Sequence, residues 1–143
     1  MNNFIENILI PFKINDKEIK NYSLLSLAFL GDSIHTLYIR NMLICKANFK
    51  IKELHTTTTK FVKAKSQSFV IENLTNLTQE EMRIVKSSKN AKTNNIAKNC
   101  TVEEYKNATS FEALLGYLAL KQEYPRLNKI LEESVKIIEK NFN

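Results

Sequence analysis

A chain of 143 residues, of which 43% are hydrophobic, is long enough to bury the core of one domain. It holds only two glycines and two prolines, which excludes a turn-rich all-β protein and favours long helices. The formal net charge at pH 7 is +6. No run approaches the ~18 apolar residues of a membrane span, so we expect neither export nor a membrane anchor.

The first half of the chain predicts three elements. A short amphipathic helix is expected from Asn2 to Phe12, followed by a polar link over residues 15–21. The strongly apolar stretch from Leu24 to Ile44 predicts a long central helix. Residues 51–74 carry apolar side chains at helical spacing and predict a second long helix.

Two helix starts in the second half carry the same signal. Residues 78–81 (Thr-Gln-Glu-Glu) and 101–104 (Thr-Val-Glu-Glu) have the form of capping boxes. Residues 89–99 are polar, basic and without periodicity, so we expect a loop between these helices. Pro125 suits the first turn of a last helix ending near Lys140. The sequence therefore predicts one all-α domain of about six helices.

Two carboxylates lie inside apolar helical stretches. Asp32 follows Gly31 in the first long helix, and Glu112 precedes Gly116 in the last but one. Small residues near both acids would let the two helices approach closely and bring the carboxylates within reach of one divalent cation, which prefers oxygen ligands. For either residue alone, the alternative is a hydrogen-bonded carboxylate at the edge of the core.

The basic charge is concentrated in the middle of the chain. Between Lys46 and Lys98 there are 11 Lys or Arg residues and 4 Asp or Glu residues. Most basic surfaces are merely solvated, but clustering of one sign favours a polyanionic partner such as nucleic acid. An acidic metal site beside a basic surface indicates a metal-dependent nuclease.

The cysteines and histidines give no sign of a second metal site. Cys45 and Cys100 stand far apart, with no disulfide framework, and suit the reducing cytoplasm. His35 and His55 have no companion at metal-ligand spacing. We therefore expect both histidines to be structural.

Four segments in order resemble the ribonuclease III endonuclease domain, and most closely its minimal branch, Mini-ribonuclease III. Together they span most of the chain from Leu24 to Leu120, which makes the resemblance specific. The segments are Leu30-Gly31-Asp32-Ser33 through Tyr38-Ile39-Arg40; Leu54-His55 with Ala64-Lys65-Ser66-Gln67; Asn90-Ala91-Lys92 with Lys98-Asn99; and Tyr105 through Phe111-Glu112-Ala113-Leu114-Leu115-Gly116-Tyr117-Leu118.

The chain departs from full ribonuclease III at several acidic positions. Leu25, Ala28 and Thr109 stand where that motif has carboxylates, and we align Lys65 with a further acidic residue. Mini-ribonuclease III resembles this reduced set. Water and phosphate oxygens would complete the metal shell, as magnesium commonly keeps several waters.

The resemblance implies a magnesium-dependent endoribonuclease that cleaves double-stranded RNA, leaving 5′-phosphate and 3′-hydroxyl ends. Asp32 and Glu112 would hold Mg²⁺, for which Mn²⁺ can substitute, and activate a water. Lys65 would either contact the scissile phosphate, which the resemblance favours, or pack its stem with its amine in water. The expected RNA-phosphate contacts are Lys60, Lys63, Lys89, Lys92 and Lys98.

The resemblance also implies partners. One site cuts one strand, so we expect a homodimer built largely on the first long helix, whose apolar residues include Ile34, Leu37, Tyr38 and Leu43. The expected substrate is the precursor of large-subunit (23S) ribosomal RNA, with a ribosomal protein or the pre-ribosome as a further partner. Residues 1–143 would form one catalytic domain without a double-stranded-RNA-binding domain.

Two other function classes compete with this interpretation. The reduced set of acids would fit a non-catalytic RNA-binding module with the same fold, but both Asp32 and Glu112 are present within their motifs. A basic helical DNA-binding protein is less favoured, because no helix-turn-helix with a polar recognition face occurs.

Overall fold

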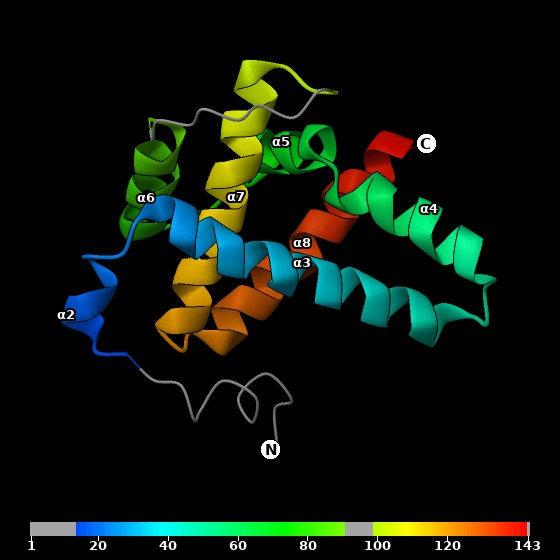
Figure 1. The fold of residues 1–143 in the computed structure, drawn as a ribbon, viewed down its shortest axis with the longest axis horizontal. Coiled ribbons are helices and arrows are strands. Elements are labelled where there is room, and N and C mark those ends of the chain that lie inside the picture. Colours follow the sequence, from blue (N-terminus) through cyan, green and yellow to red (C-terminus); the bar gives the residue numbers. More distant parts are fainter. Residues whose placement is uncertain (1–13, 91–98, 143) are drawn as a thin grey trace.

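The computed structural model describes residues 14–90 and 99–142, and within these ranges the chain is all-α, as predicted (Figure 1). The predicted helix at residues 2–12 and most of the predicted loop, residues 91–98, lie outside the described residues. None of the helices in the described part is long and apolar enough to cross a membrane. The helices in these ranges are α2 (Asp16–Ile19), α3 (Leu24–Lys46), α4 (Ile51–Val62), α5 (Ala64–Asn73), α6 (Gln79–Lys89), α7 (Val102–Leu120) and α8 (Tyr124–Phe142).

Helix α7 forms the centre of the molecule. Every residue from Asn107 to Ala119 is buried except Glu112. A helix that is apolar on all sides must be surrounded, and α3, α5, α6 and α8 all pack against it (Figure 1). Glu112 is thus the single carboxylate on the most buried turns of the fold.

The α3–α7 pair is the most extensive helix contact, and two glycines set its spacing. A Cβ on Gly31 would lie 1.7 Å from the carbonyl oxygen of Glu112, and a Cβ on Gly116 would lie 2.0 Å from that of Leu27. The two backbones therefore touch at both points, as the small residues predicted. Asp32 is held next to one of these contacts.

The prediction of a polar link over residues 15–21 is wrong, because α2 forms there. Asn15 accepts a hydrogen bond from the first turn, and Glu18 completes a capping box. Ile19 is 2% exposed and anchors this turn to the core. One buried apolar side chain and two caps stabilise a helix too short to show periodicity.

The single helix predicted over residues 51–74 is also wrong, because the chain breaks at Lys63, which is extended (φ −64°, ψ 154°). Three of the four threonines at 56–59 donate to the carbonyl four residues earlier, a pattern that bends helices. Ser66 Oγ then donates to the Lys60 carbonyl oxygen at 2.5 Å, satisfying a group that the break exposes. The break turns α5 towards α7.

Both predicted capping boxes are confirmed, at the starts of α6 and α7. The apolar surface that we expected α3 to offer to a second copy is made of other residues. Ile34 and Leu43 are buried in the core of their own chain, and Tyr38 packs partly against it. The large apolar side chains that α3 leaves exposed are Leu25, Phe29, Leu37 and Ile44.

We expect Gly31→Ala to lower the free energy of unfolding by about 3 kcal/mol, the upper end of overpacking costs, because backbone atoms must move to admit the methyl group. Helix propensity alone would give the opposite sign, a gain of ~1 kcal/mol. Urea denaturation measures the difference. Ser33→Ala, an exposed change two residues away, should stay within ~0.5 kcal/mol of wild type. A stabilised Gly31→Ala variant would contradict the close helix contact.

Candidate metal centre

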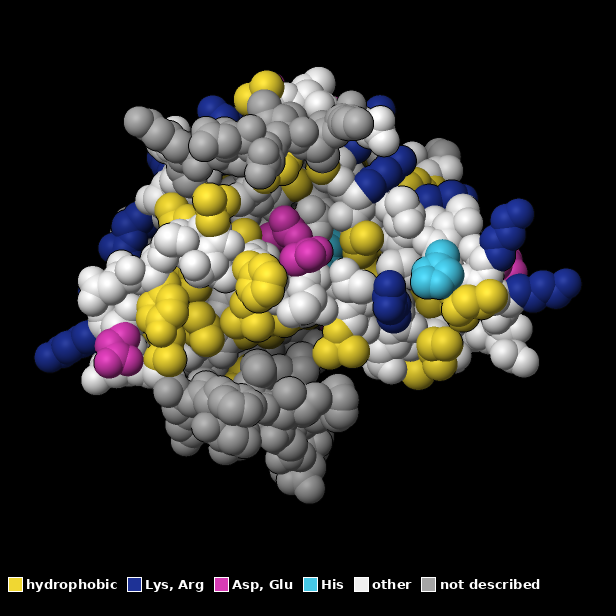
Figure 2. Space-filling model, in the orientation of Figure 1, with side chains coloured by type: hydrophobic (Ala, Val, Ile, Leu, Met, Phe, Trp, Pro, Cys, Tyr) yellow, Lys and Arg dark blue, Asp and Glu magenta, His cyan; other side chains and the backbone are white. Residues whose placement is uncertain are grey.

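The α3–α7 crossing brings together the two carboxylates that the sequence singled out. Asp32 is exposed, Glu112 is half-buried, and their side chains are hydrogen-bonded to each other. Acidic side chains lie together in the middle of the face shown in Figure 2, bordered by hydrophobic ones. Because Gly31 abuts the backbone of Glu112, the main chain that carries Asp32 is held directly against the main chain of Glu112.

The environment of Glu112 disfavours its negative charge. Burial, the hydrogen bond with Asp32 and the charge of Asp32 together raise the pKa of Glu112 to about 9, against a smaller lowering by a hydrogen bond from Gln67. At neutral pH this environment favours the protonated form of Glu112. A divalent cation would take the place of that proton, because carboxylates bind metal in the deprotonated form.

The ligand set fits a hard cation with an incomplete protein shell. Asp32 and Glu112 offer carboxylate oxygens, which magnesium prefers. Among the described residues no third Asp, Glu, His or Cys joins them in a group that could hold a metal ion. Water and substrate oxygens would have to supply the other ligands.

Behind the carboxylates lies a buried polar pair that the sequence interpretation did not assign to the site. Gln67 of α5 is 2% exposed, and its Nε2 lies 3.0 Å from Nδ1 of His35. The same Gln67 side chain hydrogen-bonds Glu112. A signal was present, because Gln67 shares a helix face with the apolar Val70 and Ile71, where a polar residue needs a partner.

His35 is a fully buried neutral histidine, in agreement with the structural role that was predicted. Its ring packs edge-on against Phe111, with centroids 5.1 Å apart and an interplanar angle of 81°. Burial lowers the pKa of His35 to about 4, so the ring is uncharged at neutral pH. It cannot serve as a cation beside the carboxylates.

The structure does not bring Lys65 to the carboxylate pair. Lys65 is exposed and lines a separate pocket with Glu72 and Glu104. It lies two residues from Gln67 and therefore on the opposite side of α5.

The other predicted RNA contacts are scattered over the surface. Lys60 and Lys63 are exposed where α4 meets α5, and Lys89 ends α6. Lys92 and Lys98 lie outside the described residues.

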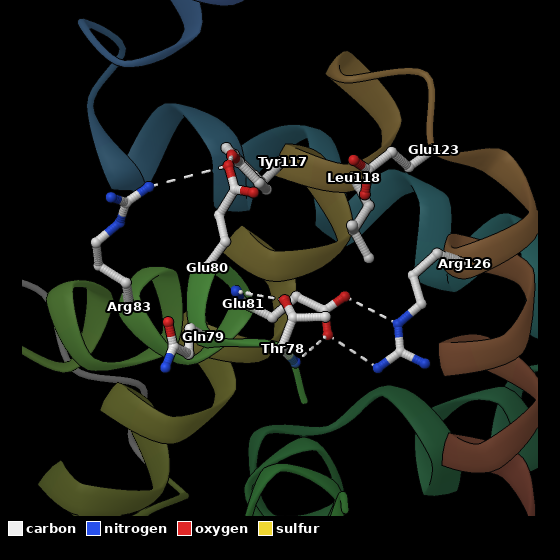
Figure 3. A pocket seen from close by; sticks show the side chains of 9 residues that line it. All are labelled: Thr78, Gln79, Glu80, Glu81, Arg83, Tyr117, Leu118, Glu123 and Arg126. Atoms are coloured by element: carbon white, nitrogen blue, oxygen red, sulfur yellow. Dashed lines mark hydrogen bonds and ion pairs between the residues drawn. The ribbon is translucent and has the colours of Figure 1, made fainter. Parts of the chain in front are cut away.

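A second polar cluster lies where α6 meets α7 and α8, in the pocket shown in Figure 3. Arg126 binds both carboxylate oxygens of Glu81, each at 2.8 Å, and Tyr117 donates to Glu80. Lys121 also pairs with Glu80, at 3.1 Å. These charges satisfy one another, so the cluster ties the helices together and leaves no reactive group.

Comparisons with known proteins agree on one family of similar chains. The model of the Ribonuclease III domain matches residues 25–123. A Mini-ribonuclease 3 from Thermoanaerobacter sp. (strain X514) is 41% identical over 97% of this chain and 96% of its own length. A Mini-ribonuclease 3 from Staphylococcus aureus is 36% identical over 86% of this chain and 94% of its own. A crystal structure of a Fusobacterium nucleatum protein is 37% identical, with a TM-score of 0.76, over 83% of this chain and 96% of that one.

The buried histidine generates a pH prediction for the metal-free protein. The folded pKa of His35, about 4, lies below the usual 6.5, so its contribution to stability is complete above pH 6.5 and is lost as pH falls to about 4. We expect that loss to reach ~3 kcal/mol at 1.36 kcal/mol per pKa unit. Denaturation of wild type and His35→Asn across this window measures it. The variant should lose less stability on acidification; equal losses would contradict the buried neutral ring.

Proposed function

The chain belongs to the Mini-ribonuclease 3 family of endoribonucleases, which act on double-stranded RNA, and we propose that Asp32 and Glu112 form its catalytic metal site. The observation that carries the proposal is the pair of neighbouring carboxylates at the glycine contacts of α3 and α7. The ion would be Mg²⁺, with Mn²⁺ able to replace it.

Each side chain of the pair has a distinct part in this proposal. Glu112, half-buried and held by Gln67, anchors the ion at a fixed depth. Asp32, exposed at the surface, holds the ion where a phosphate of the RNA can reach it. The bound ion supplies an activated water and stabilises charge on the phosphate. In-line attack would leave 5′-phosphate and 3′-hydroxyl ends.

Lysines would hold the RNA through its backbone. Duplex RNA is recognised by shape and phosphate contacts, because its deep major groove excludes side chains. Lys60 and Lys63 lie just before α5, whose first N–H groups receive no side-chain cap and can donate hydrogen bonds to a phosphate oxygen. Lys89, Lys92 and Lys98 would extend this contact, and Lys65, beside Glu104, would reach phosphate only away from the carboxylate pair.

A homodimer would place two such sites on one duplex. Phe29 is 83% exposed, and Leu25, Leu37 and Ile44 extend the apolar surface along α3. Hydrophobic side chains gather on this face of the molecule in Figure 2. Several exposed apolar side chains along one helix suit an isologous contact with a second copy.

The biological substrate is proposed from the family alone. We propose that the protein matures the ends of the 23S ribosomal RNA precursor in the cytoplasm, with a ribosomal protein or the pre-ribosome as a partner. The basic surface lysines fit a large folded RNA.

We expect Asp32→Asn and Glu112→Gln each to lower the rate of duplex RNA cleavage in Mg²⁺ by at least ~100-fold, because each removes a metal-binding charge but keeps the side-chain shape. Single-turnover cleavage assays measure the rate, and gel-shift assays in Ca²⁺ measure RNA binding, which should change little.

The matched control is Glu103→Gln, an exposed carboxylate in the first turn of the same helix α7. It should cleave at nearly the wild-type rate. Undiminished Mg²⁺-dependent cleavage by Asp32→Asn or Glu112→Gln would refute the site, and a wild type that binds duplex RNA without cutting it would favour the non-catalytic module.

The dimer has its own prediction. Wild type should sediment at about twice the chain mass at micromolar concentration, and Phe29→Ser should shift it towards the monomer, because a largely exposed aromatic ring would be lost from the contact. Val102→Ser removes an exposed apolar side chain from α7 and should leave the dimer intact. A wild type that is monomeric yet cuts both strands in concert would contradict the proposed arrangement.

A further inference from the structure

We propose that Gln67 is a positioning residue that links the carboxylate of Glu112 to the buried ring of His35 and thereby fixes that carboxylate for the metal ion. This inference rests on the proposed function of Asp32 and Glu112. Gln67 itself touches neither the metal nor the RNA in this account.

Gln67 is placed to make both contacts at once. Its side chain reaches the α3–α7 crossing from α5 and is 2% exposed. A glutamine amide has two N–H donors, and Nε2 lies 3.0 Å from Nδ1 of His35. Gln67 also hydrogen-bonds Glu112 and lowers the pKa of that carboxyl, as an amide N–H facing a carboxylate does. One side chain thus contacts both partners.

His35 fixes the far end of this link. Its ring is 0% exposed and is held edge-on against Phe111, a residue of α7 next to Glu112. The ring is neutral, so Nδ1 can accept from the amide of Gln67. Nε2 of His35 has no hydrogen-bond partner within the described part of the chain. A buried polar atom without a partner is costly, and an apolar residue would avoid that cost but could not hold Gln67.

The link matters because the protein supplies so few metal ligands. Among the described residues the site has two carboxylates, so its affinity depends on how well each is oriented before the ion arrives. A donor on one oxygen of Glu112 restricts rotation of the carboxylate and favours its ionised form. Removing such outer hydrogen bonds typically weakens metal binding by 10–100-fold.

The experiment measures Mn²⁺ binding without RNA or turnover, by the electron paramagnetic resonance signal of free Mn²⁺. Gln67→Met keeps the length of the side chain but cannot donate, and we expect it to weaken Mn²⁺ binding by ~10-fold or more. The matched control is Ser68→Ala, the next residue on α5. Ser68 is also buried and accepts a hydrogen bond from Asn107 at 3.0 Å, away from the carboxylates. This control should lose stability without losing Mn²⁺ affinity.

Variants of His35 test the far end of the link. His35→Leu removes the acceptor and should weaken Mn²⁺ binding, whereas His35→Asn keeps a polar atom near the position of Nδ1 and should restore most of the affinity. Because His35 acts through Gln67, the double variant Gln67→Met with His35→Leu should bind no more weakly than Gln67→Met alone. If Gln67→Met does not fold, the contrast between Leu and Asn at position 35 decides the matter.

Wild-type affinity in Gln67→Met, or equal losses in Gln67→Met and Ser68→Ala, would overturn the positioning role while leaving the metal site intact. Additive losses in the double variant would overturn the link through His35. If Asp32→Asn binds Mn²⁺ as tightly as wild type, the metal site itself is wrong and the role of Gln67 falls with it.

Discussion

The structure depends on the backbone contact between α3 and α7. At Gly31 and Gly116 the two helices touch main chain to main chain, with no room for a side chain on either. The contact forms the centre of the core and also determines where Asp32 and Glu112 stand. Packing and chemistry therefore share one constraint, and a change that separates the helices would damage both.

The electrostatics of the site follow from that packing. Glu112 is the one carboxylate on the buried turns of α7, and it faces another carboxylate instead of a cation of the protein. Burial and the neighbouring Asp32 both raise the pKa of Glu112, so the charged form of Glu112 is disfavoured where no cation is present. A structural ion pair would look different, as Glu81 and Arg126 show with two hydrogen bonds of 2.8 Å. The unfavourable pair is what singles out this crossing as the candidate functional site.

The sequence predicted the features that local chemistry determines. The capping boxes at Thr78 and Thr101 and the small residues beside the carboxylates were correct. It did not predict the break at Lys63, because the spacing of apolar residues does not report threonine back-bonding or the hydrogen bond from Ser66 to the carbonyl six residues earlier. The sequence interpretation also missed Gln67. Its place on the face of Val70 and Ile71 indicates that it needs a partner, but which partner it meets depends on where the break directs α5.

The most direct test of the metal site is a crystal structure of the protein soaked with Mn²⁺, with the ion located by its anomalous scattering. The account predicts one strong peak between the carboxylates of Asp32 and Glu112, with oxygen ligands at roughly 2.0–2.2 Å, close to magnesium distances. Under the same conditions Glu112→Gln should show no peak there. A wild-type crystal whose manganese binds elsewhere, with the Asp32–Glu112 hydrogen bond still in place, would contradict the account.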